Sequence, residues 1–221
     1  MEKKLKVLML NGSPRKNGNI ALAFHEMEQV FDECSVEYEN IQLGRMDIRG
    51  CIACETCRRN GKCAFDDIVN ELAVRLEAAD GLVIGSPVYF GSANGTLMSA
   101  LQRLFYSTSF DKSLKVGASV VSARRSGCTA TFDELNKFFT LANMPVATSR
   151  YWNNIYGWDP GEGQVDEEGR QVMRVLARNM VFLMQSIALG KKELGLPKAE
   201  EPRVWTNLPV DLMSFYRRNF P

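Results

Sequence analysis

Short, mainly apolar runs that alternate with helical segments constrain the fold of this chain most strongly. Such runs stand at 5–10 (LKVLML), 80–87 (DGLVIGSP) and 114–123 (LKVGASVVSA). Runs of this length with few charged residues are typical of parallel strands that are buried on both faces. Because they alternate with segments of helical character, they predict a doubly wound α/β fold, in which helices cover both faces of a parallel sheet.

The remaining elements follow the same alternation. Further strands are predicted at 36–43 and 145–152, and helices are predicted over 20–33, 67–79, 94–106, 129–142 and 166–189. At 221 residues the chain is long enough for one well-packed core, and we expect one domain over 1–190. The tail, 191–221, is too apolar to be fully solvated and is expected to pack on the domain or on a subunit neighbour. Its large apolar side chains include Trp205, Leu208, Met213 and Phe215.

Charge and hydropathy disfavour several classes of partner. The chain has 27 Lys and Arg against 26 Asp and Glu, a formal charge of +1, so no overall field attracts nucleic acid or an anionic membrane. The N-terminal apolar run is too short for a signal peptide, and we expect no segment with the roughly 20 apolar residues that span a bilayer. The expected location is cytoplasmic, where clustered cysteines more often bind metal or do redox chemistry than form disulfides.

The loop after the first predicted strand, NGSPRKNGN at 11–19, has the groups that suit a phosphate. It combines glycines for tight backbone, polar side chains, two cations and a following helix N-terminus. The candidate residues are Ser13, Arg15, Lys16, Asn17 and Asn19. The loop matches neither a Walker loop nor a Rossmann fingerprint, so a single phosphate monoester is the preferred ligand. The alternative is an ordinary polar turn.

Two further loops are expected at the same edge of the sheet, because ligands of open parallel sheets bind beyond the carboxyl ends of the strands. The loop after 80–87 contains a rigid turn, two aromatic rings and exposed backbone, which suit a flat ring, although aromatic residues at a strand end more often belong to a core. Its candidates are Pro87, Tyr89, Phe90 and Gly91. The loop after 114–123 adds Arg124 and Arg125, which on composition alone are a solvated pair.

Four cysteines fall in the segment GCIACETCRRNGKC at 50–63, with the spacing C-x2-C-x2-C-x5-C. Three cysteines at successive x2 spacings suit three corners of an iron–sulfur cubane, and Cys63 can supply the fourth ligand. Zinc sites more often use two separated C-x2-C pairs. Reduced thiols without a metal, or a dithiol redox pair in CIAC, remain as alternatives.

The segments LNGSPRKNGN and GSPVYFGSANGTLMSALQR, together with the order of strands and helices, resemble the NAD(P)H-dependent FMN reductase family of the flavodoxin-like superfamily. The added CIACETCRRNGKCAFDD is similar to the iron–sulfur flavoproteins within that family. The resemblance implies a five-stranded parallel sheet of order 2-1-3-4-5, FMN as cofactor and NAD(P)H as electron donor. It also favours a 4Fe–4S cluster on Cys51, Cys54, Cys57 and Cys63.

Site residues follow from the resemblance by position. The family's FMN phosphate loop falls on Ser13, Arg15, Lys16, Asn17 and Asn19. Its isoalloxazine loop falls on Pro87, Val88, Tyr89, Phe90 and Gly91, and its third flavin loop falls on Ala123, Arg124 and Arg125. In that third loop the chain departs from the family's often glycine-rich pattern. No catalytic residue is implied, since hydride transfer to a flavin needs no general acid or base, and a single histidine excludes a His-based triad.

The resulting expectation is an FMN-dependent oxidoreductase that moves electrons from NAD(P)H or another low-potential donor through FMN to a small-molecule or redox-protein acceptor. The alternatives are a cluster-free NAD(P)H-dependent FMN or quinone reductase and a non-catalytic electron-transfer flavoprotein. A phosphate-binding hydrolase or phosphatase is disfavoured, because no nucleophile–histidine arrangement is present. A site built from open loops usually needs a lid, so we expect a homodimer or homotetramer in which the tail or the aromatic residues of 151–158 cover it.

Overall fold

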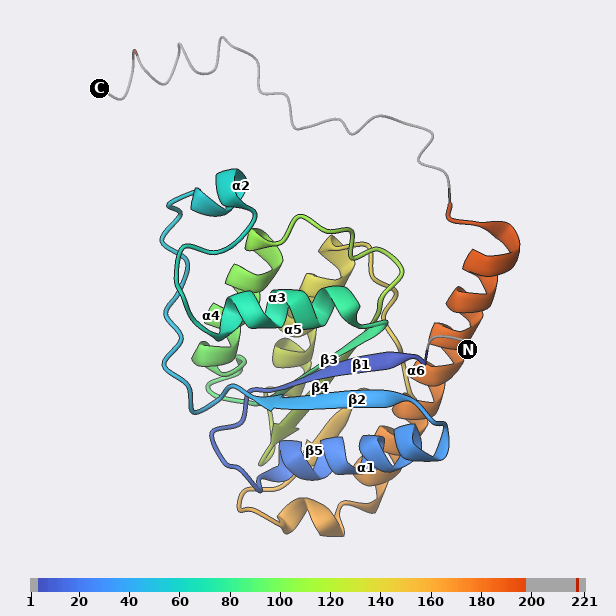
Figure 1. The fold of residues 1–221 in the computed structure, drawn as a ribbon. Coiled ribbons are helices and arrows are strands. Elements are labelled where there is room, and N and C mark those ends of the chain that lie inside the picture. The colour runs from blue at the N-terminus through green and yellow to red at the C-terminus, as the bar shows by residue number, and fades with distance from the viewer. Residues whose placement is uncertain (1–3, 198–217, 219–221) are drawn as a thin grey trace. The chain divides into compact units, whose positions relative to one another are not determined.

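The computed structural model describes residues 4–197 and Arg218. Within them, one parallel sheet has the strand order β2-β1-β3-β4-β5 (Figure 1). The strands are β1 (Lys6–Asn11), β2 (Glu37–Gln42), β3 (Gly81–Pro87), β4 (Val116–Ala123) and β5 (Asn154–Tyr156). The predicted flavodoxin-like order 2-1-3-4-5 is confirmed. The strand order reverses between β1 and β3, which is where ligands bind in folds of this class.

Helices follow the strands as the alternation predicts. They are α1 (Asn19–Glu33), α2 (Thr56–Asn60), α3 (Ile68–Ala78), α4 (Gly95–Ser107), α5 (Cys128–Leu141) and α6 (Glu167–Leu194), with a 3-10 helix, η1 (Glu162–Val165), before the last. The sequence did not predict α2 and η1. Each is a short turn of helix inside a connecting segment, and neither is long enough to show a helical period.

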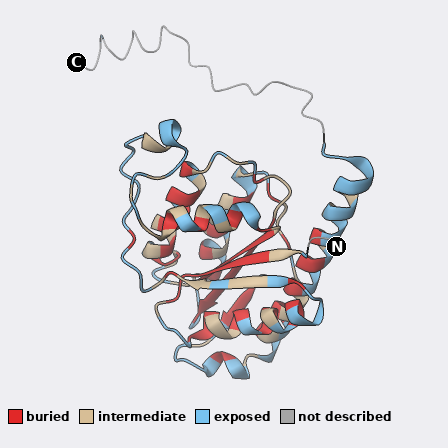
Figure 2. Cartoon of the chain, viewed as in Figure 1, coloured by how far each residue is buried: buried red, intermediate tan, exposed pale blue. Residues whose placement is uncertain are grey.

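The sheet separates two hydrophobic cores (Figures 1 and 2). Successive side chains of a strand point to opposite faces. In β1, Val7 and Met9 therefore join the core under α1 and α6, whereas Leu8 and Leu10 join the core under α3, α4 and α5. All four side chains are fully buried. Burial on both faces explains the unbroken apolar runs from which the strands were predicted.

The prediction of a strand at 145–152 is wrong. That segment makes only an isolated bridge between Val146 and Gly117, and β5 begins two residues later. The cause is Asn153, whose Nδ2 donates to the carbonyl oxygen of Ser119 at 2.9 Å and whose carbonyl oxygen accepts from the amide of Val121 at 3.0 Å. An amide side chain thus replaces part of the backbone ladder, and pairing resumes at Asn154.

Among the described residues, α6 is long and apolar enough to cross a membrane by length and composition alone, so the expectation that no segment could span a bilayer stays a prediction. This helix, however, carries a stripe of buried side chains between Val172 and Met184 that packs in the first core. A core helix passes the same test of length and composition, so α6 gives no argument for a membrane.

The chain divides into two compact units, Met1–Leu189 and Gly190–Pro221. The packing predicted for the tail rests on Trp205, Leu208, Met213 and Phe215. All four lie outside the described residues, so the assignment of 1–190 as the domain and 191–221 as a packing tail stays a prediction.

Candidate functional site

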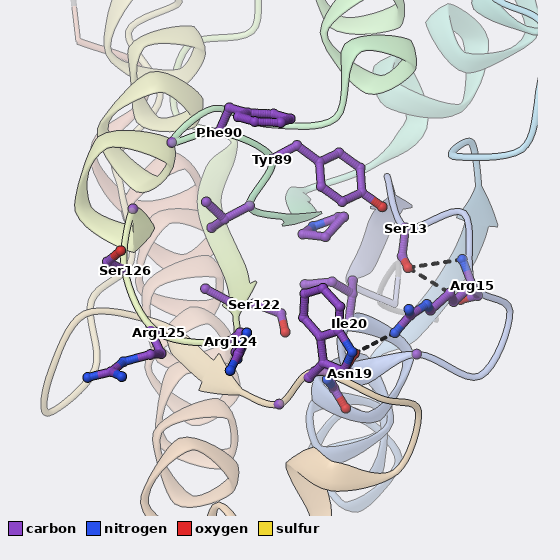
Figure 3. Close-up of a pocket in the computed structure, with 18 residues that line it drawn as sticks. Ser13, Arg15, Asn19, Ile20, Tyr89, Phe90, Ser122, Arg124, Arg125 and Ser126 are labelled. Atoms are coloured by element: carbon purple, nitrogen blue, oxygen red, sulfur yellow. Dashed lines mark hydrogen bonds between the residues drawn. The ribbon is translucent and has the colours of Figure 1, made fainter.

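A pocket of about 760 Å³ opens at the carboxyl ends of β1, β3 and β4 (Figure 3). It is lined by the loops that follow these strands and by the segment after β5. Its volume lies within the range of roughly 300–1,000 Å³ that is usual for small-molecule sites. The pocket therefore stands at the switch point at which the fold is expected to bind its ligand.

The pocket brings together most residues that the sequence singled out. These are Ser13, Arg15, Asn19, Pro87, Val88, Tyr89, Phe90, Gly91, Ala123, Arg124 and Arg125. Lys16 and Asn17 do not line it, and both are exposed. Sequence reasoning missed Gly18, Ile20, Ser122, Ser126, Gly127, Gly157 and Trp158. Most of these flank predicted residues, so reading whole loops rather than single positions would have found them.

Two helices begin at the pocket without a side-chain cap. Gly18 precedes α1 and Gly127 precedes α5, and neither can place a side-chain oxygen on the first-turn amides. In contrast, α3 is capped by Asp67 and α4 by Asn94, whose side chains accept from backbone amides. Uncapped first-turn amides and the positive end of the helix dipole favour an anionic ligand.

The first loop is held in shape by its own hydrogen bonds. The backbone amide of Ser13 donates to Oδ1 of Asn11 at 2.9 Å, and the Ser13 Oγ accepts from the amide of Arg15 at 3.2 Å. The carbonyl oxygen of Ser13 accepts from Nε2 of Gln42 at 2.9 Å. Because the turn is fixed from several sides, it offers its polar groups with little reorganisation.

Trp158 connects the first and third loops at the pocket wall. The guanidinium of Arg15 donates to the carbonyl oxygen of Trp158 and lies 3.9 Å from the carboxylate of Asp159. The guanidinium of Arg124 lies 5.5 Å from the centre of the Trp158 ring. The aromatic residues of 151–158 were expected to cover a site in a homodimer or homotetramer, and this expectation stays a prediction. Trp158 lines the pocket of its own chain.

The second loop is a tight turn that projects at the pocket mouth. Tyr89 and Ser92 exchange backbone hydrogen bonds of 2.9 and 3.0 Å, while Phe90 and Gly91 between them have φ angles of 53° and 79°. Glu134 of α5 anchors the turn by accepting from the Oγ of Ser92 at 2.7 Å and from the following amide at 2.8 Å. The turn presents Phe90 fully to solvent beside the pocket.

Of the residues that the structure describes, three arginines and no carboxylate line the pocket. The arginines are Arg15, Arg124 and Arg125. This excess of positive charge and the uncapped starts of α1 and α5 suit a phosphate, whereas Val88, Tyr89 and Ile20 provide apolar wall for a ring. The residues present therefore fit FMN, which combines an aromatic ring system with one phosphate.

Cys128 lies under the third loop as the first residue of α5. Burial raises the pKa of its thiol, although a hydrogen bond with Tyr156 partly opposes this. Burial also raises the pKa of Tyr156, helped by Cys128. Both groups are therefore neutral near pH 7 and add no charge beside the pocket.

The four clustered cysteines line one small cavity of about 20 Å³, which shares no lining residue with the flavin pocket. They are Cys51, Cys54, Cys57 and Cys63. Cys51 and Cys54 are exposed, and Cys57 and Cys63 are half-buried. Within residues 4–197, no three His, Cys, Asp or Glu side chains converge closely enough to hold a metal ion. The loop thus gathers four sulfurs without closing them into a ligand set.

Three features of this loop nevertheless fit an iron–sulfur cluster. The donors are four sulfurs, and the cavity walls include Phe65 and Tyr106. Two sulfurs accept N–H hydrogen bonds: Cys51 from the amide of Ala53 at 3.4 Å, and Cys63 from a buried arginine. Ala53 and Glu55 both have left-handed backbone, with φ of 52° and 55°, a strain that tends to occur at functional sites.

Comparison with known proteins shows which family this chain belongs to. Residues 5–159 match the family model described as NADPH-dependent FMN reductase. An iron–sulfur flavoprotein of Methanocaldococcus jannaschii is 31% identical over 191 residues, which cover 83% of this chain and 99% of that protein. An iron–sulfur flavoprotein of Methanosarcina thermophila is 27% identical and covers 83% of this chain and 97% of that protein.

A solved structure shares the fold. The NAD(P)H:quinone oxidoreductase from Methanothermobacter marburgensis superimposes with a TM-score of 0.63 at 17% identity, covering 80% of this chain and 96% of that one. The fold is flavodoxin-like, and the family model places the chain in the class of FMN-binding oxidoreductases. The chain belongs to the NADPH-dependent FMN reductase family, and relatives named iron–sulfur flavoproteins match it over most of its length.

Proposed function

We propose that this chain binds FMN in the pocket at the switch point and moves electrons from NAD(P)H, or another low-potential donor, to an acceptor. The observation that carries the proposal is the pocket itself, where two uncapped helix N-termini and three arginines face an apolar wall. Membership of the FMN reductase family supports both the cofactor and the reaction class.

The chain's own residues bind, orient and shield the cofactor. FMN, when bound, supplies the hydride and single-electron chemistry. Ser13, Arg15 and the start of α1 would hold the phosphate, and the backbone of Val88 to Gly91 would hold the ring. Trp158 closes the wall between Arg15 and Arg124 and limits the access of water.

We further propose that Cys51, Cys54, Cys57 and Cys63 hold a 4Fe–4S cluster, so that single electrons pass to a small-molecule or redox-protein acceptor. Support comes from the four sulfurs at one cavity, from the N–H groups that donate to two of them, and from the names of the relatives. Thiolate ligands are often brought together only when the metal binds, which is consistent with a gathered but open set.

The test is purification without oxygen, followed by flavin identification and assays of iron and acid-labile sulfide on the same sample. The proposal expects stoichiometric FMN, about four iron atoms per chain, and loss of the iron in Cys54→Ser with FMN retained. Cys34→Ser is the matched control, because Cys34 is an exposed thiol outside the cysteine loop and its loss should change neither cofactor. A protein that cannot be loaded with FMN would contradict the proposal at its root.

A second candidate is a cluster-free NAD(P)H-dependent FMN or quinone reductase. It is favoured by the absence of a closed metal-ligand set among residues 4–197. Full FMN with no iron after anaerobic reconstitution would select it. Bleaching of the flavin only by a reduced redox protein, and not by NADPH or NADH, would instead indicate a non-catalytic carrier.

A cytoplasmic location and assembly into a homodimer or homotetramer also stand as proposals. The fully exposed Phe90 beside the pocket mouth supports an assembly, since an aromatic ring at that position would be covered by a neighbouring subunit. A monomeric mass in sedimentation equilibrium would contradict it.

A further inference from the structure

A buried arginine stands behind the cysteine loop. Arg103, on α4, is 1% exposed, and it is the largest fully buried side chain among the described residues. Burying a guanidinium is costly unless every N–H finds a partner and the charge is balanced. Its partners therefore indicate what the site is built to hold.

One side of the guanidinium is neutralised by a carboxylate. Its Nη1 donates to Oδ2 of Asp67 at 2.7 Å and its Nη2 donates to Oδ1 at 2.8 Å, a two-point pair. Asp67 also caps α3, so its position is fixed by the fold. The Nη1 donates as well to the carbonyl oxygen of Arg49 at 3.2 Å, and the ring of Phe65 lies 4.8 Å from the guanidinium carbon. The charge is thus balanced without any contribution from a cysteine.

The other side of the guanidinium is directed at one sulfur. Nε and Nη2 of Arg103 lie 3.3 and 3.2 Å from the Sγ of Cys63. A thiol is a weak hydrogen-bond acceptor, so two N–H groups of a buried cation would gain little from bonding to a neutral Cys63 thiol. A metal-bound sulfur keeps negative charge and accepts such bonds well, and hydrogen bonds to cluster sulfurs are among the factors that set a cluster's potential.

The backbone of Cys63 is fixed to the same degree. Its amide donates to Oδ1 of Asn70 at 3.0 Å, and its carbonyl oxygen accepts from the Asn70 Nδ2 at 3.2 Å. The other three cysteines lie in the segment 51–57, where the hydrogen bonds of Cys51 with Ala53 and of Cys54 with Thr56 stay within the segment itself. Cys63 is the anchored corner of the set.

We propose that Arg103 is a positioning residue for the cluster: it holds Cys63 in place as the pre-set ligand and, through its two N–H groups, raises the cluster's reduction potential. This inference rests on the proposed cluster and adds the residue that orients and tunes it. Loss of the two hydrogen bonds should lower iron occupancy and shift the cluster, but not the flavin, to lower potential.

The test compares anaerobically purified full-length proteins carrying Arg103→Lys or the double change Arg103→Met with Asp67→Asn. Lysine keeps the charge but loses the fork of donors. The double change removes the charge pair as a unit and leaves an asparagine that still caps α3, so folding is protected. Arg170→Lys is the matched control, since Arg170 pairs with the buried Glu26 at 2.7 Å outside the cysteine loop.

Iron per chain, FMN per chain and the cluster's midpoint potential are measured on each protein. Both Arg103 variants should keep full FMN, lose iron several-fold, and shift the one-electron equilibrium of the remaining cluster about tenfold, which is 59 mV, toward the oxidised form. Arg170→Lys should match the wild type. Unchanged iron and potential in both Arg103 variants would overturn the role of Arg103 alone. A wild type that carries FMN but no iron would overturn the proposed cluster, and this inference with it.

Discussion

The flavin pocket and the cysteine loop prepare their sites in opposite ways. The pocket is formed at the ends of buried strands, and its turns are held by backbone and side-chain hydrogen bonds such as those of Ser13 and Glu134. The cysteine loop is largely exposed, and only Cys63 among its sulfurs is tied to buried groups. The fold can therefore form the first site without its ligand, whereas the second would close into a ligand set only on binding the proposed metal.

The largest effect should come from Gly44→Ala, which tests how tightly the pocket is built. A Cβ at this position would lie 2.3 Å from the carbonyl oxygen of Gly12 and 2.3 Å from the carbonyl carbon of Ser13. Because backbone has to move, we expect a loss of about 3 kcal/mol in the free energy of unfolding and loss of FMN binding. Gly190→Ala is the control, since nothing lies within 4 Å of its added methyl group. Equal stability in chemical denaturation for the two variants would contradict the tight pocket.

The next largest effect is expected on FMN affinity, where two cationic residues of the first loop should differ. Arg15→Ala should weaken FMN binding about 10- to 100-fold, because one charge-assisted hydrogen bond is worth about 1.5–3 kcal/mol. Lys16→Ala should change it less than about twofold, since Lys16 is exposed and does not line the pocket. Fluorescence titration with FMN at fixed salt measures both. Equal losses would mean that the predicted family positions, rather than the pocket as described, define the phosphate site.

The stability of the domain should depend on pH through Glu26 of α1, which forms ion pairs with Arg170 and Arg174 of α6. Burial raises the Glu26 pKa, but hydrogen bonds and charge from the two arginines outweigh it, so the net pKa lies below the ordinary 4.5. A depressed folded-state pKa contributes stability above the unfolded value, which is lost as pH falls through the folded one.

Glu26→Gln should therefore cost about 1–2 kcal/mol at pH 7, and this difference from the wild type should shrink below roughly pH 4.5. Thermal unfolding from pH 7 to pH 3 measures it. A difference between the two proteins that stays constant with pH would show that the ion pair does not contribute.

The smallest effect is expected from removing iron. Stripping the proposed cluster from anaerobically purified protein with a chelator should leave FMN bound and the domain folded. The reason is that the cysteine loop contributes few buried side chains to either core. Release of FMN together with the iron would show that the two sites are coupled, and would contradict the claim that the flavin pocket forms independently of the cysteine loop.

The fold was largely predictable, because β1, β3 and β4 are buried on both faces and short unbroken apolar runs of this kind are typical of parallel strands. The position of β5 was not, since the asparagine that interrupts the ladder looks like any polar loop residue until its partner, the Ser119 carbonyl, is placed beside it. A strand at the edge of a sheet is specified by such neighbours more than by its own pattern.

Some residues of the two candidate sites were likewise predictable from the sequence, and others were not. Loops that follow strands could be read from the sequence, because the fold brings strand ends together. Trp158 and Arg103 could not be assigned their places. Trp158 comes from a segment with no periodicity, and an arginine on an amphipathic helix is ordinarily solvated, so the burial of Arg103 depends on Asp67 and Cys63, about 40 residues away in the chain.

The most direct test of the central claim is the affinity of the flavin-free protein for FMN compared with riboflavin, which lacks the phosphate. The arginines and uncapped helix starts predict that FMN binds on the order of 100-fold more tightly, and that Arg15→Ala removes much of this preference. Equal affinity for the two flavins would contradict the account, because it would mean that the pocket does not recognise a phosphate.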